Sequence, residues 1–244
     1  MTITHLGAKR LQGTKFDRKN DSLGSSADGI NSGVTLVGGV AWQIRPNDKS
    51  YYDLTSVHDS NWTLRFRWKI TDITRHTSTD FGWFGISDSI GGKNTSQDFV
   101  GFTYNPYNNY PYDLQLQDVD GSTLGLGTGD SSGSAYSLAN STWSDGDEFW
   151  YEMVRNGTTL TLKVFSDSGY STQVGSTLTK TIGSESGLRY IVQCGDNSRS
   201  DDKTGHIEGE LGSLQFWNNS TSASGDATAT VSASDWTNAG NNTL

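Results

Sequence analysis

The chain has 244 residues, of which 18% are charged, and its formal net charge at pH 7 is -9. It holds 29 Gly and 60 Ser and Thr residues, so good helix formers are scarce and helix-rich architectures are disfavoured. Aromatic residues still make up 11% of the chain, which excludes a disordered low-complexity protein because these groups can form a core. No apolar run approaches the roughly 18 residues of a membrane span, and the single Cys194 excludes an internal disulfide.

The elements that the sequence predicts are strands. Near the N-terminus, short runs predict strands at 34–37, 41–44 and 51–54. Apolar and polar residues alternate strictly from Trp62 to Ile70, which predicts a strand with one face in a core. Shorter strands are predicted at 81–87, 99–104 and 113–119. Residues 149–155 and 158–166 flank Asn156-Gly157, a pair that favours a type I′ turn, and predict a β-hairpin.

Two further strands are predicted at 187–195 and 208–217. Strands separated by Gly, Asn, Asp and Ser turns, with no convincing helix between them, are typical of a two-sheet sandwich or barrel.

The two ends of the chain differ from its middle. The first 20 residues hold five cations against one Asp, a net +4, which leaves -13 on the rest. After residue 217 the chain is almost entirely Ser, Thr, Ala, Asn and Gly, a composition that cannot bury enough surface to order itself. We therefore expect a basic N-terminal arm at 1–30, a β-sandwich at 31–217 and a polar C-terminal tail at 218–244. Both ends are expected to contact neighbouring subunits, so that the chain self-associates.

Three segments share a pattern of strand and turn. They are the hairpin from Phe149 to Ser166, the segment Trp62 to Ile73 and the late segment Gly209 to Asn218. Together they resemble concanavalin A-like jelly rolls, laminin-G-like domains in particular. The resemblance implies an all-β, two-sheet antiparallel jelly-roll sandwich with extended N- and C-terminal arms. It does not imply a function, because the fold hosts lectins, adhesins, glycoside hydrolases, polysaccharide lyases and viral surface domains.

The most unusual stretch for ligand binding is 104–113, which holds four Tyr and three Asn. Tyrosine faces stack on sugar rings and asparagine amides exchange hydrogen bonds with hydroxyls. The candidate glycan-binding residues are Tyr104, Asn105, Tyr107, Asn108, Asn109, Tyr110 and Tyr112. The alternative is a loop pinned to the body by its own tyrosines. A second candidate surface is the row Arg65, Arg67 and Lys69, which suits an anionic glycan on a concave face or solvent on a convex one.

Calcium is the one candidate cofactor, because hard oxygen ligands on loops suit it. The candidate ligands are Asp196, Asn197, Asp201 and Asp202 in one turn, with Asp118 and Asp120 as a second place. The alternative is a solvated acidic turn at either place.

Catalytic signals are weaker. Glu208 and Glu210 stand at alternate positions of a strand, with His206 upstream, and resemble in part the paired carboxylates of glycoside hydrolases of this fold. The intervening Asp and third carboxylate of that pattern are missing. His58 and His76 have polar, loop-like neighbours and are expected at the surface. Nucleic-acid binding is disfavoured by the acidic body, because phosphate contacts need clustered cations.

These observations favour a non-catalytic, lectin-like structural or adhesion protein that self-assembles through its arms and displays a glycan-binding surface. One alternative is a polysaccharide lyase or glycoside hydrolase, for which Glu208 and Glu210 would be the pair to mutate. The other is a coat or decoration subunit with no ligand. The composition is of an extracellular type although no signal peptide follows Met1, which favours the extracellular surface or a virion.

Overall fold

A computed structural model describes residues 35–36, 39–44, 49–74, 82–90, 97–104, 114–121, 123–125, 144–195, 206–231 and 237–238. All regular elements within these ranges are strands. They are β1 (Thr35–Leu36), β2 (Gly39–Ile44), β3 (Lys49–Asp53), β4 (Trp62–Thr74), β5 (Gly82–Ser87), β6 (Phe99–Tyr104), β7 (Leu114–Asp120), β8 (Thr123–Gly125), β9 (Glu148–Asn156), β10 (Thr159–Phe165), β11 (Gln173–Thr181), β12 (Tyr190–Gly195), β13 (His206–Asn218), β14 (Ala229–Val231) and β15 (Thr237–Asn238). Over the same ranges there is no helix that could cross a membrane.

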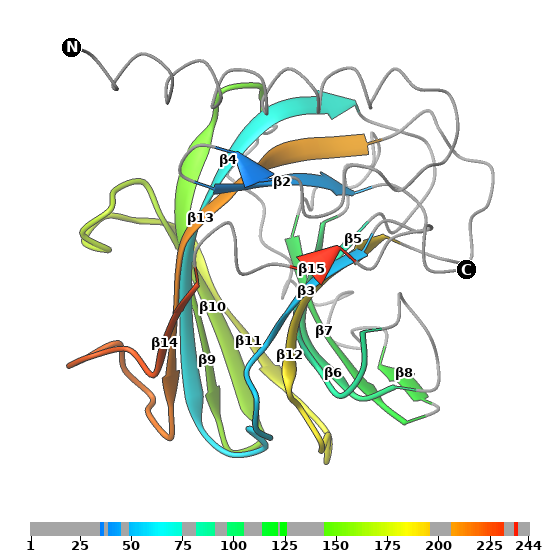
Figure 1. Ribbon diagram of the computed structural model, residues 1–244. Helices are drawn as coiled ribbons and strands as arrows, with labels where there is room; N and C mark the ends of the chain where they lie inside the picture. Colours follow the sequence, from blue (N-terminus) through cyan, green and yellow to red (C-terminus); the bar gives the residue numbers. More distant parts are fainter. Residues whose placement is uncertain are drawn as a thin grey trace, which may run out of the picture.

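The strands form two sheets, and all of their pairings are antiparallel (Figure 1). Sheet A has the order β1-β2-β13-β4-β9-β10-β11, with β14 added to β13. Sheet B has the order β15-β3-β12-β5-β6-β7-β8. The predicted all-β, two-sheet antiparallel jelly-roll sandwich is therefore confirmed.

The core lies between the two sheets and begins with the alternation of β4. Its apolar residues Trp62, Leu64, Phe66, Trp68 and Ile70 are all 0% exposed. The Phe66 ring is stacked on Tyr151 of β9 at a centroid distance of 4.8 Å, and it meets Phe84 of sheet B at 4.6 Å. These aromatic contacts join the sheets, and full burial of each such side chain contributes about 1.5–3 kcal/mol.

A smaller apolar cluster covers the other face of sheet B. It consists of Phe99, Val119 and Val192, with Tyr51 and Tyr190 packed against it. The Phe99 ring lies over the paired glycines Gly85 and Gly101, since a Cβ on Gly101 would stand 2.6 Å from Phe99 Cζ and 2.7 Å from Gly85 Cα. Only glycine at both positions leaves room for this ring on the sheet.

The β9–β10 hairpin is confirmed, but its turn lies one residue later than predicted. Asn156 pairs with Thr159, so the loop residues are Gly157 and Thr158. Gly157 has a φ of 58°, whereas Asn156 and Thr158 are not among the described residues with positive φ. The predicted type I′ turn is wrong, because Asn156 stays in the strand ladder and one glycine at the first loop position is typical of a type II′ turn.

Four strands carry no sequence signal that we used, namely β8, β11, β14 and β15. Along β11 most side chains are exposed and Leu178 is the buried one, because β11 is the edge of sheet A. An edge strand of this kind lacks the apolar alternation by which strands are predicted.

Two of these strands lie in the stretch predicted as a polar tail. Val231 of β14 pairs with Leu214 of β13, and Thr237 of β15 pairs with Tyr51 of β3. Strand pairing therefore continues past residue 217, because backbone hydrogen bonds need no apolar side chain. The basic arm at 1–30 lies outside the described residues and stays a prediction.

Candidate functional site

Two of the segments with predicted ligand-binding residues leave sheet B at the same end. Tyr104 is the last residue of β6 and pairs with Gly82 of β5. Gly82 also pairs with Gly195, the last residue of β12. β6 and β12 therefore run in the same direction on either side of β5, and their ends are two strand spacings apart, about 10 Å. Both strands therefore end at the same end of sheet B.

The connections that follow these two strands carry the residues that the sequence singled out. Asn105, Tyr107, Asn108, Asn109, Tyr110 and Tyr112 follow β6, and Asp196, Asn197, Asp201 and Asp202 follow β12. All of them lie outside the described residues, so their roles stay predictions. What the strand register adds is their common origin at one end of sheet B, although about 90 residues separate them along the chain.

The second predicted calcium site consists of Asp118 and Asp120, and both side chains bind other groups of the protein. Asp118 Oδ2 accepts a hydrogen bond from the Gly183 N–H at 3.2 Å, and Asp118 Oδ1 lies 3.2 Å from Lys180 Nζ. Asp120 Oδ2 accepts hydrogen bonds from the Ser184 N–H and hydroxyl at 3.2 and 3.0 Å. In the part of the chain that the structure describes, no group of three or more His, Cys, Asp or Glu side chains is arranged to hold a metal ion.

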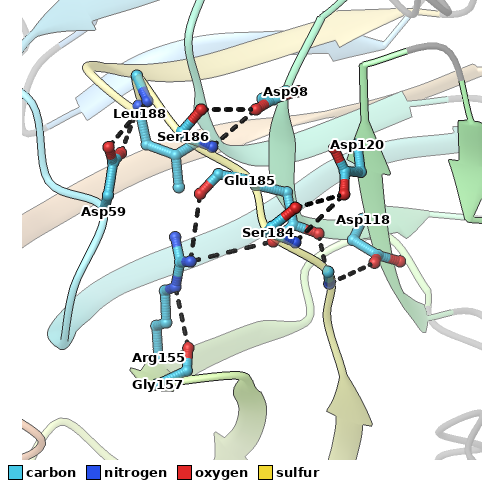
Figure 2. Close-up of polar contacts among 12 residues, drawn as sticks. Asp59, Asp98, Asp118, Asp120, Arg155, Gly157, Ser184, Glu185, Ser186 and Leu188 are labelled. Atoms are coloured by element: carbon cyan, nitrogen blue, oxygen red, sulfur yellow. Dashed lines mark hydrogen bonds and ion pairs between the residues drawn. The ribbon is translucent and has the colours of Figure 1, made fainter.

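The connection between β11 and β12, residues 182–189, is held by carboxylates from other segments (Figure 2). Besides Asp118 and Asp120, Asp98 accepts from the Ser186 N–H at 2.7 Å, and Asp59 accepts from the N–H groups of Gly187 and Leu188 at 3.0 and 2.9 Å. Backbone donors without a strand partner are thereby satisfied. Sequence analysis missed this role, because isolated acidic residues near turns look like solvated ones.

Within this connection, Glu185 turns into the protein interior and is 1% exposed. Its Oε1 accepts a hydrogen bond from the Gly183 N–H at 2.8 Å, and its Oε2 lies 4.0 Å from Arg155 Nη2 and has no hydrogen-bond partner. Burial raises the pKa of Glu185 to about 7, and the hydrogen bond and charge of Asp118 act in the same direction. A carboxyl group of this kind can donate or accept a proton near neutral pH.

Arg155 is the buried cation beside Glu185 (Figure 2). It donates from Nη2 to the Glu185 carbonyl oxygen at 3.3 Å and from Nε to the Gly157 carbonyl oxygen at 3.2 Å. Burial lowers the pKa of its guanidinium, while the charges of Glu185 and Asp59 act against that change. Arg155 therefore pairs with buried groups of the protein, and its charge is not accessible to a ligand in solvent.

The basic row on β4 is already paired with glutamates of β9. Arg65 binds Glu152 Oε2 through Nε at 2.8 Å and Nη2 at 2.5 Å, and Arg67 Nη1 lies 3.0 Å from Glu148 Oε1. The Tyr170 ring lies 4.0 Å from Arg65 Cζ, and burial raises the pKa of the Tyr170 hydroxyl to about 12. Because both guanidinium groups have protein partners, this face does not favour an anionic glycan.

The structure gives the register of the predicted carboxylate pair. Glu208 pairs with Asp72 of β4 and Gln43 of β2, and Glu210 pairs with Lys69 and Ala41. His206, upstream of them, is the first residue of β13 and pairs with Thr74. A catalytic role for Glu208 and Glu210 stays the alternative to the non-catalytic prediction.

The expectation that His58 lies at the surface is wrong. Its side chain is 4% exposed, and its ring meets Phe216 edge-on at 4.9 Å. The Nε2 atom is 3.1 Å from Ser56 Oγ, and the His58 N–H donates to the Leu188 carbonyl oxygen at 2.7 Å. Polar neighbours in sequence misled the prediction, because the segment folds back over β13. His76 lies outside the described residues.

Comparisons with known proteins identify no family. No family model and no curated protein match this chain. Among solved structures, the chain is similar to the VIP36 exoplasmic/lumenal domain bound to Ca2+ and mannose, with a TM-score of 0.48 and 10% identity over 85% of this chain and 87% of that one. It is also similar to sheep galectin-11 in complex with glycerol, with a TM-score of 0.37 and 8% identity over 75% and 99%.

A third similar structure is the alginate lyase from Klebsiella pneumoniae, with a TM-score of 0.34 and 13% identity over 66% of this chain and 61% of that one. At such identities and TM-scores, these proteins share with the chain no more than an arrangement of strands. Its ligand has to be inferred from its own residues.

Proposed function

We propose that this chain is a non-catalytic carbohydrate-binding protein whose site lies at the end of sheet B, where residues 105–113 and 196–205 leave β6 and β12. The observation that carries the proposal is the pairing of Gly195 with Gly82 and of Gly82 with Tyr104. It places the last residues of β6 and β12, which the Tyr- and Asn-rich and the Asp- and Asn-rich segments follow in the sequence, on either side of β5. Binding loops supported by a β-sandwich are a common arrangement for recognition.

The chemistry of the two segments is complementary. Tyrosine rings of 105–113 supply flat apolar contact for a sugar ring, and asparagine amides supply donors and acceptors for its hydroxyls. The oxygens of Asp196, Asn197, Asp201 and Asp202 suit calcium, a hard cation that can also take sugar hydroxyls as ligands.

The scaffold under these segments is well supported. β5, β6 and β12 lie within sheet B and have a partner strand on each side. Phe84, Phe102 and Ile191 of these strands are buried in the main core, and Phe99 and Val192 are buried on the opposite face. Sheet B therefore fixes where the two connections begin.

A non-catalytic role is supported by the burial of Glu185, a carboxyl group that could otherwise exchange protons near neutral pH. Glu185 is the described carboxyl whose pKa is raised to about 7, and it is 1% exposed and faces Arg155. A polysaccharide could not reach it. Self-association through residues 1–30 and 218–244, at a virion or cell surface, is a further part of the proposal, supported by the +4 arm beside the -13 remainder.

The test is a glycan array probed with the full chain and with Tyr107→Ala and Tyr110→Ala. Loss of one stacking contact should weaken binding roughly tenfold. Tyr170→Ala is the matched control, because Tyr170 packs on Arg65 of sheet A, outside the proposed site. A calcium chelator should weaken the same binding if the 196–205 segment holds the ion.

Binding that survives both tyrosine substitutions would show that the site is elsewhere. No binding to any glycan would refute the function, and release of sugar products from a polysaccharide panel would refute the non-catalytic part. Light scattering before and after deletion of residues 1–20 tests self-association, and a monomer in both cases contradicts it.

A further inference from the structure

A lysine and an aspartate face each other inside one edge of the sandwich. Lys180 lies two residues after the buried Leu178 on β11 of sheet A, and Asp118 lies two residues after the buried Leu116 on β7 of sheet B. Residues two apart on a strand share a face, so both side chains point between the sheets. Their side chains are only 13% and 12% exposed.

The two groups are in contact without a regular hydrogen bond. Lys180 Nζ lies 3.2 Å from Asp118 Oδ1, yet Oδ1 has no hydrogen-bond partner. The other oxygen, Oδ2, accepts the Gly183 N–H at 3.2 Å. The Asp118 carboxyl thus has an amine beside one oxygen and a fixed backbone donor on the other. This arrangement suits attack of the amine on the carboxyl carbon.

A third group completes this arrangement. The carboxyl of Glu185 lies beside that of Asp118, because the Gly183 N–H donates to an oxygen of each, and it is fully shielded from solvent. The Gly183 N–H holds both carboxyls, because it also donates to Glu185 Oε1 at 2.8 Å. Glu185 is therefore placed to exchange a proton with Asp118.

We propose that Lys180 and Asp118 form an intramolecular isopeptide bond, with Glu185 as the catalytic residue that transfers protons.

The reaction needs no partner beyond these side chains. The first step is proton transfer from the ammonium of Lys180 to the carboxylate of Asp118, which gives a neutral amine and a carboxylic acid. The Nζ lone pair attacks Asp118 Cγ, and the negative charge that develops on Oδ2 is stabilised by the Gly183 N–H. Glu185 accepts a proton from the nitrogen and returns it to the departing Oδ1 hydroxyl. One C–N bond forms, one C–O bond breaks and one water molecule leaves.

The surroundings favour this chemistry. Lysine amines become nucleophiles when they are desolvated. A raised pKa lets Glu185 hold its proton near neutral pH and act as an acid as well as a base. The Arg155 guanidinium, 4.0 Å from Glu185 Oε2, stabilises the carboxylate that exists after the proton has been given up. The product amide would link the edge strand β11 of sheet A to β7 of sheet B in a chain without disulfides.

Intact-mass spectrometry of the full-length protein tests the proposal. The wild-type protein should be lighter than its sequence mass by one water molecule. A tryptic digest should join residues 94–155, which hold Asp118, to residues 164–189, with cleavage after Lys180 blocked. The location matters, because succinimide formation at Asp120-Gly121 also removes one water molecule.

Two variants serve as controls. Lys180→Arg keeps the cation but has no amine nucleophile, so it should have the full mass while any succinimide would persist. Glu185→Gln keeps the side-chain volume, and its linked fraction should fall at least tenfold in a time course after refolding. A full-mass wild-type protein after prolonged incubation, or separate peptides 94–155 and 164–180 in its digest, would overturn the bond. Linkage of Glu185→Gln at the wild-type rate would overturn the role of Glu185.

Discussion

Replacement of Glu185 by glutamine should remove a pH dependence of stability that this one buried carboxyl creates. The pKa of Glu185 is raised from its ordinary value of 4.5 to about 7 in the folded protein, chiefly by burial. The side chain is 1% exposed, so solvent screening does not reduce the effect. Since one pKa unit corresponds to about 1.36 kcal/mol, the carboxyl should lower the free energy of unfolding by about 3 kcal/mol at pH 8 relative to pH 4.5.

The sign follows from proton binding. Below pH 4.5 Glu185 is protonated in both the folded and the unfolded chain and has no effect on the balance between them. Between pH 4.5 and 7 the unfolded chain releases the proton and the folded chain retains it, so stability falls as the pH rises. Above pH 7 both states are ionised and the loss levels off. Glutamine is neutral throughout and gives no such slope.

The measurement is urea unfolding followed by tryptophan fluorescence at pH 4.5, 6, 7 and 8. Both the reference protein and the Glu185→Gln variant should carry Lys180→Arg, so that an amide at Asp118 does not alter the surroundings of Glu185. From pH 4.5 to 8, the unfolding free energy of the reference protein should fall by about 3 kcal/mol relative to that of the glutamine variant. Two curves that stay parallel from pH 4.5 to 8 would refute the reasoning.

Three further substitutions test the fold. Gly101→Ala should destabilise the protein by about 1–3 kcal/mol in urea unfolding, because its Cβ would meet the Phe99 ring and the backbone of Gly85; an unchanged midpoint would contradict this packing. Gly157→Ala should reduce stability by about 1 kcal/mol, because φ is 58° and nothing lies within 4 Å of the added Cβ, and a neutral result would argue against the type II′ turn. Asp59→Ala should reduce stability by about 1–3 kcal/mol and speed hydrogen exchange at the two amides that Asp59 accepts. Exchange at the wild-type rate would show that this contact does not hold the segment.

The sequence was most informative where a strand has one face in the core. The run from Trp62 to Ile70 alternates because water is on one side and the second sheet on the other, and all of its apolar residues are buried as predicted. The bounds of β6 also agree with the prediction, although apolar residues of β6 are buried on both faces of sheet B. By contrast, β11 passes unnoticed, because an edge strand with mostly exposed side chains has no periodicity to detect.

The candidate ligand segments show a second limit. Their residue types are legible in the sequence, since Tyr, Asn and Asp concentrate in two short stretches. That both segments follow strands ending at the same end of sheet B cannot be predicted from the sequence, because it depends on β5 lying between β6 and β12 in the sheet. Strand order is set by long-range pairing, and local composition carries little information on it.

Composition, turn chemistry and period-two alternation therefore determined by themselves that this chain is an all-β sandwich or barrel, because these features report which backbone conformations and which faces are stable locally. Only the tertiary structure brought Asp118, Lys180 and Glu185 together. They come from β7, from β11 and from the connection after it, and the sequence singled out only Asp118, as a candidate calcium ligand. Their chemistry arises from shared burial, which exists only when the two sheets close on each other.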